Sequence, residues 1–160
     1  MLRCSLMSYR TIIVAVENDH SDNAVCDRAV AIAKNCDAQI ILFHVVEPLV
    51  VPVTAGMVGA VSVSTLPPDD ERQAEILAEN RAQLKERAEK IGDLVVDQRV
   101  VESALVCDSI HEVAEEFNAD LIVAGSPGRH GLSLFFVGST TSDLLKNAPC
   151  DILAVRITDD

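Results

Sequence analysis

Three glycines late in the chain have a spacing that suits an anion-binding loop. Gly125 and Gly128 stand three residues apart, and Gly138 follows ten residues later, directly before Ser139 and Thr140. Glycine reaches backbone angles closed to other residues and lets backbone N–H groups approach an oxyanion closely. The pattern G-x2-G-x9-G-S therefore indicates a phosphate site.

The residues around these glycines add donors and charge. Gly138 and the hydroxyl residues up to Thr141 are expected to open a helix, whose free N–H groups and dipole favour a negative charge. Arg129 supplies a cation within the loop. The loop lacks the G-K-[ST] of Walker sites and the G-x-G-x-x-G of dinucleotide folds. On spacing alone an alternative stays open, in which the glycines shape a turn and cap a helix without any ligand.

Five runs rich in apolar residues are expected to form the strands that position this loop. They cover residues 11–16, 38–46, 94–103, 120–125 and 150–157. Helical periodicity fills residues 24–35 and 69–92, and Gly92 is placed to end the longer helix. Asp108 or Ser109 is expected to cap a short helix, and residues 138–146 to form the last one.

Alternation of strands and helices predicts an α/β fold with parallel strands and right-handed crossovers. We expect a doubly wound, five-stranded, flavodoxin-like or Rossmann-like sheet of order 3-2-1-4-5, with helices on both faces. The polar residues of the third strand favour an edge position. In such a sheet, ligands bind where the strand order reverses, here between the first and fourth strands. The glycine loop leaves the fourth strand at that point.

Composition limits the classes of function. The formal charge of −12 argues against nucleic acid and anionic lipid as partners, because both require a basic face. The five cysteines include no C-x-x-C pair, which favours a reducing, cytoplasmic setting over zinc ligation or a disulfide framework. We expect a single nucleotide-binding domain over residues 9–158, preceded by a disordered tail at residues 1–8.

The uncharged segment from Pro48 to Leu66 requires a separate interpretation. Its prolines, glycines and β-branched residues make it a poor helix, although its length approaches that of a membrane span. We expect a mobile apolar loop after the second strand, in preference to insertion into a membrane or partner.

The histidines and the first acidic cluster have ordinary structural explanations. His44 is expected to be a hydrogen-bonded core residue, and His130 a solvated loop residue rather than a general base. Glu17, Asp19 and Asp22 lie at the start of the first helix, where acidic side chains suit the dipole and act as caps.

The glycine pattern after "DLIVAGS", followed by "LLKNAPCDILAVR", resembles the universal stress protein family in its ATP-binding branch. The segments "IIVAVENDHSDNAV" and "AQIILFHVVEP" resemble the first strand and helix and the second strand of that family. The resemblance extends from Tyr9 to Arg156.

This resemblance implies a set of nucleotide contacts. Adenine and ribose contacts fall on Ala15, Glu17 and Val45, although the family usually has Asp at position 17. Phosphate contacts fall on Gly125, Ser126, Gly128, Gly138, Ser139 and Thr140, with Ala124 and Thr141 beside them and Arg129 able to cover a phosphate. The resemblance also implies a homodimer through the strand from Cys150 to Ile157, whose edge has no further strand to cover it.

We therefore expect a cytoplasmic, homodimeric stress sensor or regulator that binds ATP. The choice among ATP, ADP and AMP, and a part for magnesium, stay open. Hydrolysis is expected to be slow or absent, because no residue pair stands out as nucleophile and base. One alternative is an ATPase or nucleotide-transfer enzyme. Another is a nucleotide-independent interaction module that regulates a protein partner.

Overall fold

The computed structural model describes residues 9–19, 22–48, 51–54, 63–66, 70–126 and 144–157, and all structural statements concern these residues. The strands are β1 (Thr11–Ala15), β2 (Gln39–Val46), β3 (Val51–Thr54), β4 (Val63–Leu66), β5 (Val95–Glu102), β6 (Leu121–Ser126) and β7 (Asp151–Arg156). The helices are α1 (Asp22–Cys36), α2 (Asp70–Ile91) and α3 (Val106–Glu116), and residues 144–146 are also helical.

Five of the described strands form a parallel sheet of order β5-β2-β1-β6-β7. This is the order 3-2-1-4-5 expected for the five long strands, so that prediction is confirmed. β5, with Asp97, Gln98 and Arg99 in its middle, is an edge strand as expected. Charged and polar side chains are tolerated there because an edge strand is less enclosed than a central one.

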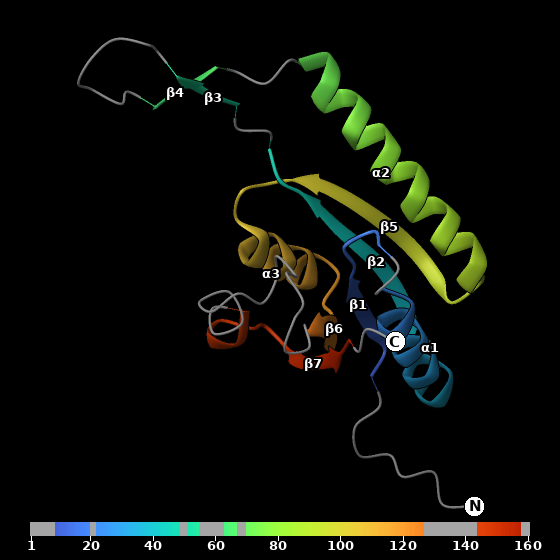
Figure 1. The fold of residues 1–160 in the computed structure, drawn as a ribbon. Coiled ribbons are helices and arrows are strands. Elements are labelled where there is room, and N and C mark those ends of the chain that lie inside the picture. Colours follow the sequence, from blue (N-terminus) through green and yellow to red (C-terminus); the bar gives the residue numbers. More distant parts are fainter. Residues whose placement is uncertain are drawn as a thin grey trace, which may run out of the picture.

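Helices cover both faces of this sheet (Figure 1). Alternate residues of a strand point to opposite faces. Ile12 and Val14 of β1 accordingly belong to the apolar cluster under α1 and α2, whereas Ile13 and Ala15 belong to the cluster under α3. Every residue of β1 is buried, which explains why its sequence from Ile12 to Ala15 is apolar throughout rather than alternating.

The helix ends agree with the sequence at one helix and differ at another. α2 ends before Gly92, whose φ of 83° lies in the left-handed region that favours glycine. For α3, the expected cap at Asp108 or Ser109 is wrong. This helix starts at Val106, after Leu105, and has no side-chain cap. The Ser109 hydroxyl donates to the Leu105 carbonyl at 3.0 Å, so it bonds back along the helix instead of capping it.

The segment expected to be an irregular apolar loop contains two strands. β3 and β4 pair antiparallel, with Val51 opposite Leu66 and Thr54 opposite Val63. They lie apart from the five-stranded sheet, on the path from β2 to α2 (Figure 1). The expectation of a loop is therefore wrong for these residues, because their β-branched side chains favour pairing in strands. No helix among the described residues combines the length and apolar character needed to cross a membrane.

Candidate functional site

The strand order reverses between β1 and β6, which makes the carboxyl ends of these two strands the candidate site. Ala15, the last residue of β1, stands opposite Phe43 of β2 on one side and Ala124 of β6 on the other. The loops after β1 and β6 thus start side by side.

The structure brings the expected nucleoside residues Ala15 and Val45 onto one face of the sheet. Both side chains are buried in the apolar cluster under α3, together with Phe43 and Ala124. Since these side chains are small or apolar, they can offer a ligand an apolar floor and backbone groups, but no charge.

Gly125 is explained by packing rather than by its backbone angles. It lies in β6 opposite Val155, and its φ is outside the left-handed region. A Cβ atom there would meet the Ile157 Cδ1 atom at 2.6 Å and the Val25 Cγ2 atom at 3.4 Å. The expectation that Gly125 adopts angles closed to other residues is therefore wrong. Glycine suits this position because the side chains of Ile157, which follows β7, and of Val25 in α1 lie close to it.

Most of the expected phosphate contacts lie outside the described residues. Ser126 is the last residue of β6. The remaining ones, Gly128, Arg129, Gly138, Ser139, Thr140 and Thr141, together with His130, are beyond the described segments, and their role stays a prediction.

The loop after β1 is held by one buried carboxylate. Asp22, in the first turn of α1, is 2% exposed. Its Oδ1 accepts the Glu17 N–H at 2.9 Å, and its Oδ2 accepts the Asp19 N–H at 3.0 Å. Between them, Asn18 has a φ of 62°. The sequence interpretation of Asp22 as a helix cap is therefore incomplete, because both oxygens turn back to the loop.

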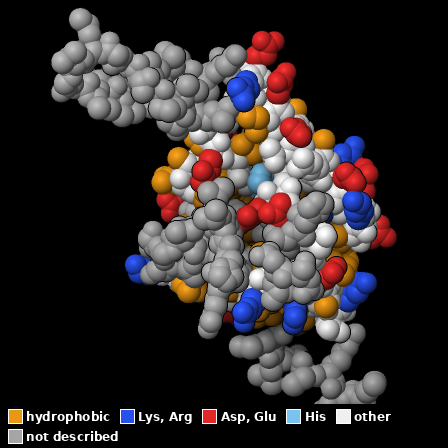
Figure 2. Space-filling model, viewed as in Figure 1, with side chains coloured by type: hydrophobic (Ala, Val, Ile, Leu, Met, Phe, Trp, Pro, Cys, Tyr) orange, Lys and Arg blue, Asp and Glu red, His pale blue; other side chains and the backbone are white. Residues whose placement is uncertain are grey.

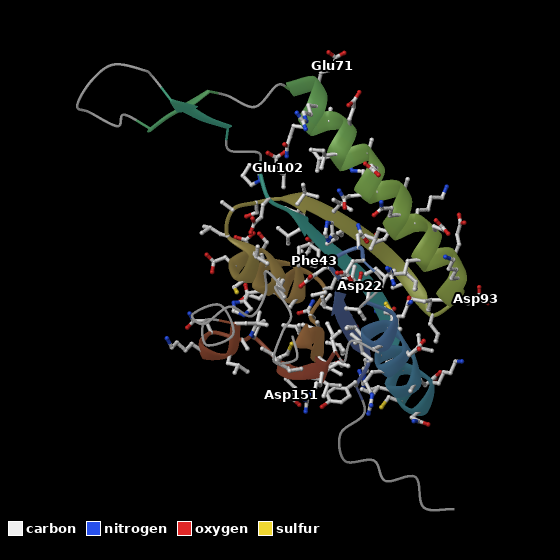
Figure 3. All side chains as sticks on the ribbon, in the orientation of Figure 1. Asp22, Phe43, Glu71, Asp93, Glu102 and Asp151 are labelled. Carbon is white, nitrogen blue, oxygen red and sulfur yellow. The ribbon has the colours of Figure 1, made fainter. Side chains whose placement is uncertain are left out.

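Arg87 of α2 reaches the same carboxylate. Its Nη2 lies 3.2 Å from Asp22 Oδ2 and donates to the Asp19 carbonyl at 3.0 Å. Asp22 is labelled in Figure 3, at the start of α1. Burial raises the pKa of the Asp22 carboxyl above its ordinary value, against the lowering effects of the Glu17 amide and the Arg87 charge.

Asn80 of α2 makes a second contact with this loop. The Asn18 Nδ2 donates to the Asn80 carbonyl at 3.2 Å and to its Oδ1 at 3.0 Å. Sequence reasoning missed Asn80 and Arg87, because neither position differs in type from the polar residues of an ordinary exposed helix face. Figure 2 shows how common such charged side chains are on the α2 side of the molecule, where acidic and basic groups are interspersed.

His44 is a core residue, as expected. It is 8% exposed, and its Nδ1 donates to the Val16 carbonyl at 2.8 Å. The Val16 N–H in turn donates to the Phe43 carbonyl at 2.9 Å. These bonds fix the point at which the chain leaves β1. Within the described segments, no group of three or more His, Cys, Asp or Glu side chains could hold a metal ion.

Known proteins resemble this chain over nearly its whole length. Universal stress protein A homolog 2 of Coxiella burnetii is 34% identical over 152 residues, which cover 94% of this chain and 97% of that protein. Among solved structures, the universal stress protein UspA from Lactobacillus plantarum matches with a TM-score of 0.67 and 23% identity, over 94% of this chain and 99% of that one. A universal stress protein in complex with cAMP matches with a TM-score of 0.65 and 24% identity, over 95% and 100%.

Because the two solved structures are only 23% and 24% identical to this chain, they support the fold alone. They agree with the five-stranded parallel sheet and its helices on both faces. A sequence profile of the universal stress protein family matches residues 8–156. The chain belongs to the universal stress protein family.

Proposed function

We propose that this protein binds ATP at the carboxyl ends of β1 and β6 and acts as a homodimeric stress sensor or regulator. The observation that carries the proposal is the reversal of strand order between β1 and β6, with the G-x2-G-x9-G-S pattern leaving β6 there. Ligands bind at such points in open parallel sheets. A related universal stress protein in complex with cAMP supports an adenine nucleotide as the ligand class.

Each end of the nucleotide has its own group of residues in this proposal. Ala15 and Val45 form the apolar floor for the adenine, and Glu17 contacts the ribose. The phosphates lie against the residues that follow Ala124, namely Gly125, Ser126, Gly128, Gly138, Ser139, Thr140 and Thr141, with Arg129 above them. Backbone N–H groups are suited to this task because the chain as a whole carries a charge of −12, which opposes an anion.

We expect slow hydrolysis, because two titratable side chains near the β1 end, Asp22 and His44, are engaged in structural contacts. Asp22 accepts two backbone N–H groups and pairs with Arg87. His44 donates to the Val16 carbonyl from within the core. A general base needs to reach the proton that it abstracts. The bound state, rather than turnover, then carries the regulatory role.

The homodimer is proposed to form through β7. Within the described sheet, β7 has β6 on one side and no strand on the other. Ala154 of β7 is exposed, and Ile152 and Leu153 are half-buried. A second copy could cover this edge. Sedimentation of Ala154→Arg is expected to yield a monomer, whereas Ala31→Arg, at an exposed position of α1, is expected to stay dimeric.

Binding of ATP is tested by thermal unfolding of the purified, nucleotide-free protein. At a hundredfold excess over the dissociation constant, ATP is expected to raise the unfolding midpoint by about 5–10 °C. Gly138→Val is expected to abolish this shift, because a side chain would block the approach of a phosphate to the backbone. Ala104→Val adds the same kind of bulk at an exposed position and is expected to keep the shift. An unchanged ATP affinity in Gly138→Val would contradict the assignment of the phosphate contacts to the G-x2-G-x9-G-S pattern.

A further inference from the structure

We propose that Asp22 and Arg87 are positioning residues for the nucleoside end of the nucleotide site, through their hold on the loop from Glu17 to Asp19. This inference rests on the proposed function. Neither side chain is assigned a contact with the nucleotide. Their role is to fix the backbone that carries Glu17, the proposed ribose contact, at the carboxyl end of β1.

Asp22 bonds the loop on both sides of its one left-handed residue. Asn18 has a φ of 62°, a conformation that glycine and, less often, asparagine or aspartate adopt. On either side of it, the N–H groups of Glu17 and Asp19 point to one carboxylate, at 2.9 and 3.0 Å. Asp22 therefore clamps the turn from inside.

Arg87 holds this carboxylate in place. A carboxylate that is 2% exposed is stable only when it is paired and hydrogen-bonded. The Arg87 guanidinium lies 3.2 Å from Asp22 and also donates to the Asp19 carbonyl and, at 3.4 Å, to the Asn23 Oδ1. Arg87 thus contacts both Asp22 and the loop that Asp22 positions.

Two residues on one face of α2 form hydrogen bonds with the loop from Glu17 to Asp19. Asn80 and Arg87 are seven residues apart, which places them two turns from each other on the same side of a helix. Leu84 lies between them and is fully buried, at 1% exposed. Asn80 accepts a hydrogen bond from the Asn18 side chain, and Arg87 donates one to the Asp19 carbonyl. The loop position is therefore determined by the packing of α2 on the sheet.

The location of the clamp restricts its effect to one end of the ligand. The loop from Glu17 to Asp19 follows β1, whereas the proposed phosphate contacts follow β6. Loosening the clamp is expected to weaken binding of the nucleoside part and to leave binding of the triphosphate part unchanged. Apparent affinity falls in proportion to the fraction of molecules whose loop is in the competent position.

The test is a calorimetric titration with ATP, and a competition titration with inorganic tripolyphosphate, both well below the unfolding midpoint. Asp22→Asn, Arg87→Met and the double variant are compared with wild type. If the loop occupies its place a tenth of the time, each single variant binds ATP about tenfold more weakly. The double variant is expected to be no weaker than the worse single one, because both changes remove the same hold. Tripolyphosphate affinity is expected to change by less than about twofold.

The charge change of each variant separates positioning from simple electrostatics. Removing an acidic group should strengthen the binding of an anion, and removing a basic group should weaken it. Positioning instead requires both Asp22→Asn and Arg87→Met to weaken ATP binding. Asp27→Asn on α1 and Lys90→Met on α2 carry the same charge changes at exposed positions and are the matched controls.

The outcomes separate failure of this inference from failure of the proposed function. A wild-type protein that does not bind ATP overturns the proposed function, and the inference falls with it. Wild-type binding with unchanged ATP affinity in both variants, even at reduced stability, overturns only the inference. Equal loss for ATP and tripolyphosphate also overturns it. If Asp22→Asn does not fold, Asn80→Ala removes one of the two hydrogen bonds from Asn18 and keeps the bond to the backbone carbonyl of residue 80, so it is expected to show a smaller but equally selective loss of ATP binding.

Discussion

The Nη2 atom of Arg87 lies 3.2 Å from the Oδ2 atom of Asp22 and so joins α2 to the first turn of α1. Both side chains are largely removed from solvent, with 18% of the arginine and 3% of the aspartate side chain exposed. The pair stands directly behind the loop that leaves β1, beside the reversal of strand order. In our proposal, stability and ligand positioning therefore depend on the same contact.

Breaking this pair is expected to destabilise the fold. Arg87→Met leaves the buried Asp22 carboxylate without its cation, which is expected to cost about 3 kcal/mol of unfolding free energy. Urea denaturation measures this loss. Lys90→Met removes a cation from the exposed pair with Glu86 and is expected to stay close to wild type. Equal losses of unfolding free energy in the two variants would show that the buried pair contributes no more to stability than the exposed pair does.

The pKa of Asp22 sets a pH dependence of known sign. Burial raises this pKa above its ordinary value of 3.8, so the folded state binds its proton more tightly than the unfolded state does. The contribution of Asp22 to stability is then fully present below the unfolded pKa and is lost as the pH rises through the folded pKa.

The difference in unfolding free energy between wild type and Asp22→Asn isolates this effect from all other carboxylates. We expect the difference to fall as the pH increases from about 4 to 7. A difference that grows over this interval would mean that the Arg87 charge and the loop amides outweigh burial.

Two thiols are expected to be unreactive in the folded protein. Burial raises the pKa of Cys26 and of Cys150 to about 11, from an ordinary value of 9.0. Since the thiolate is the nucleophile, alkylation near neutral pH should be about a hundredfold slower than for an ordinary thiol. Mass spectrometry after iodoacetamide treatment measures this rate, with the urea-unfolded chain as control. Equal rates in the folded and unfolded chain would contradict the raised pKa values.

Gly125→Ala tests the packing explanation for this glycine. The new Cβ would lie 2.6 Å from the present position of Ile157 Cδ1, so Ile157 has to move. We expect a loss of about 1 kcal/mol, typical of mild overpacking. In an Ile157→Ala background the added cost should disappear, because the contacting atom is gone. A persistent cost would instead point to the backbone of β6 as its origin.

The sequence predicts the sheet well because its strands carry strong local signals. The apolar run from Ile12 in β1 and the polar middle of β5 indicate a central and an edge strand, and both are confirmed. The end of α2 at Gly92 has a local cause in the backbone angle that glycine permits. These features depend on residues close together in the chain.

The errors have physical reasons at particular residues. Ser109 can cap a helix or bond back to the carbonyl four residues earlier, and the sequence does not distinguish these uses. Gly125 leaves room for the Ile157 side chain, which comes from the residue after β7 and is distant in sequence. The link of Asp22 to Arg87 joins two helices that are far apart in the sequence. No local pattern marks it, since both residue types are ordinary in solvated helices.

The most direct test of the proposed site is a crystal structure of the protein grown with ATP. We expect the adenine against Ala15 and Val45, the ribose at Glu17, and the phosphates along the chain that follows Gly125. ATP bound elsewhere, or crystals that contain no nucleotide at saturating ATP, would contradict the assignment of the site to the carboxyl ends of β1 and β6.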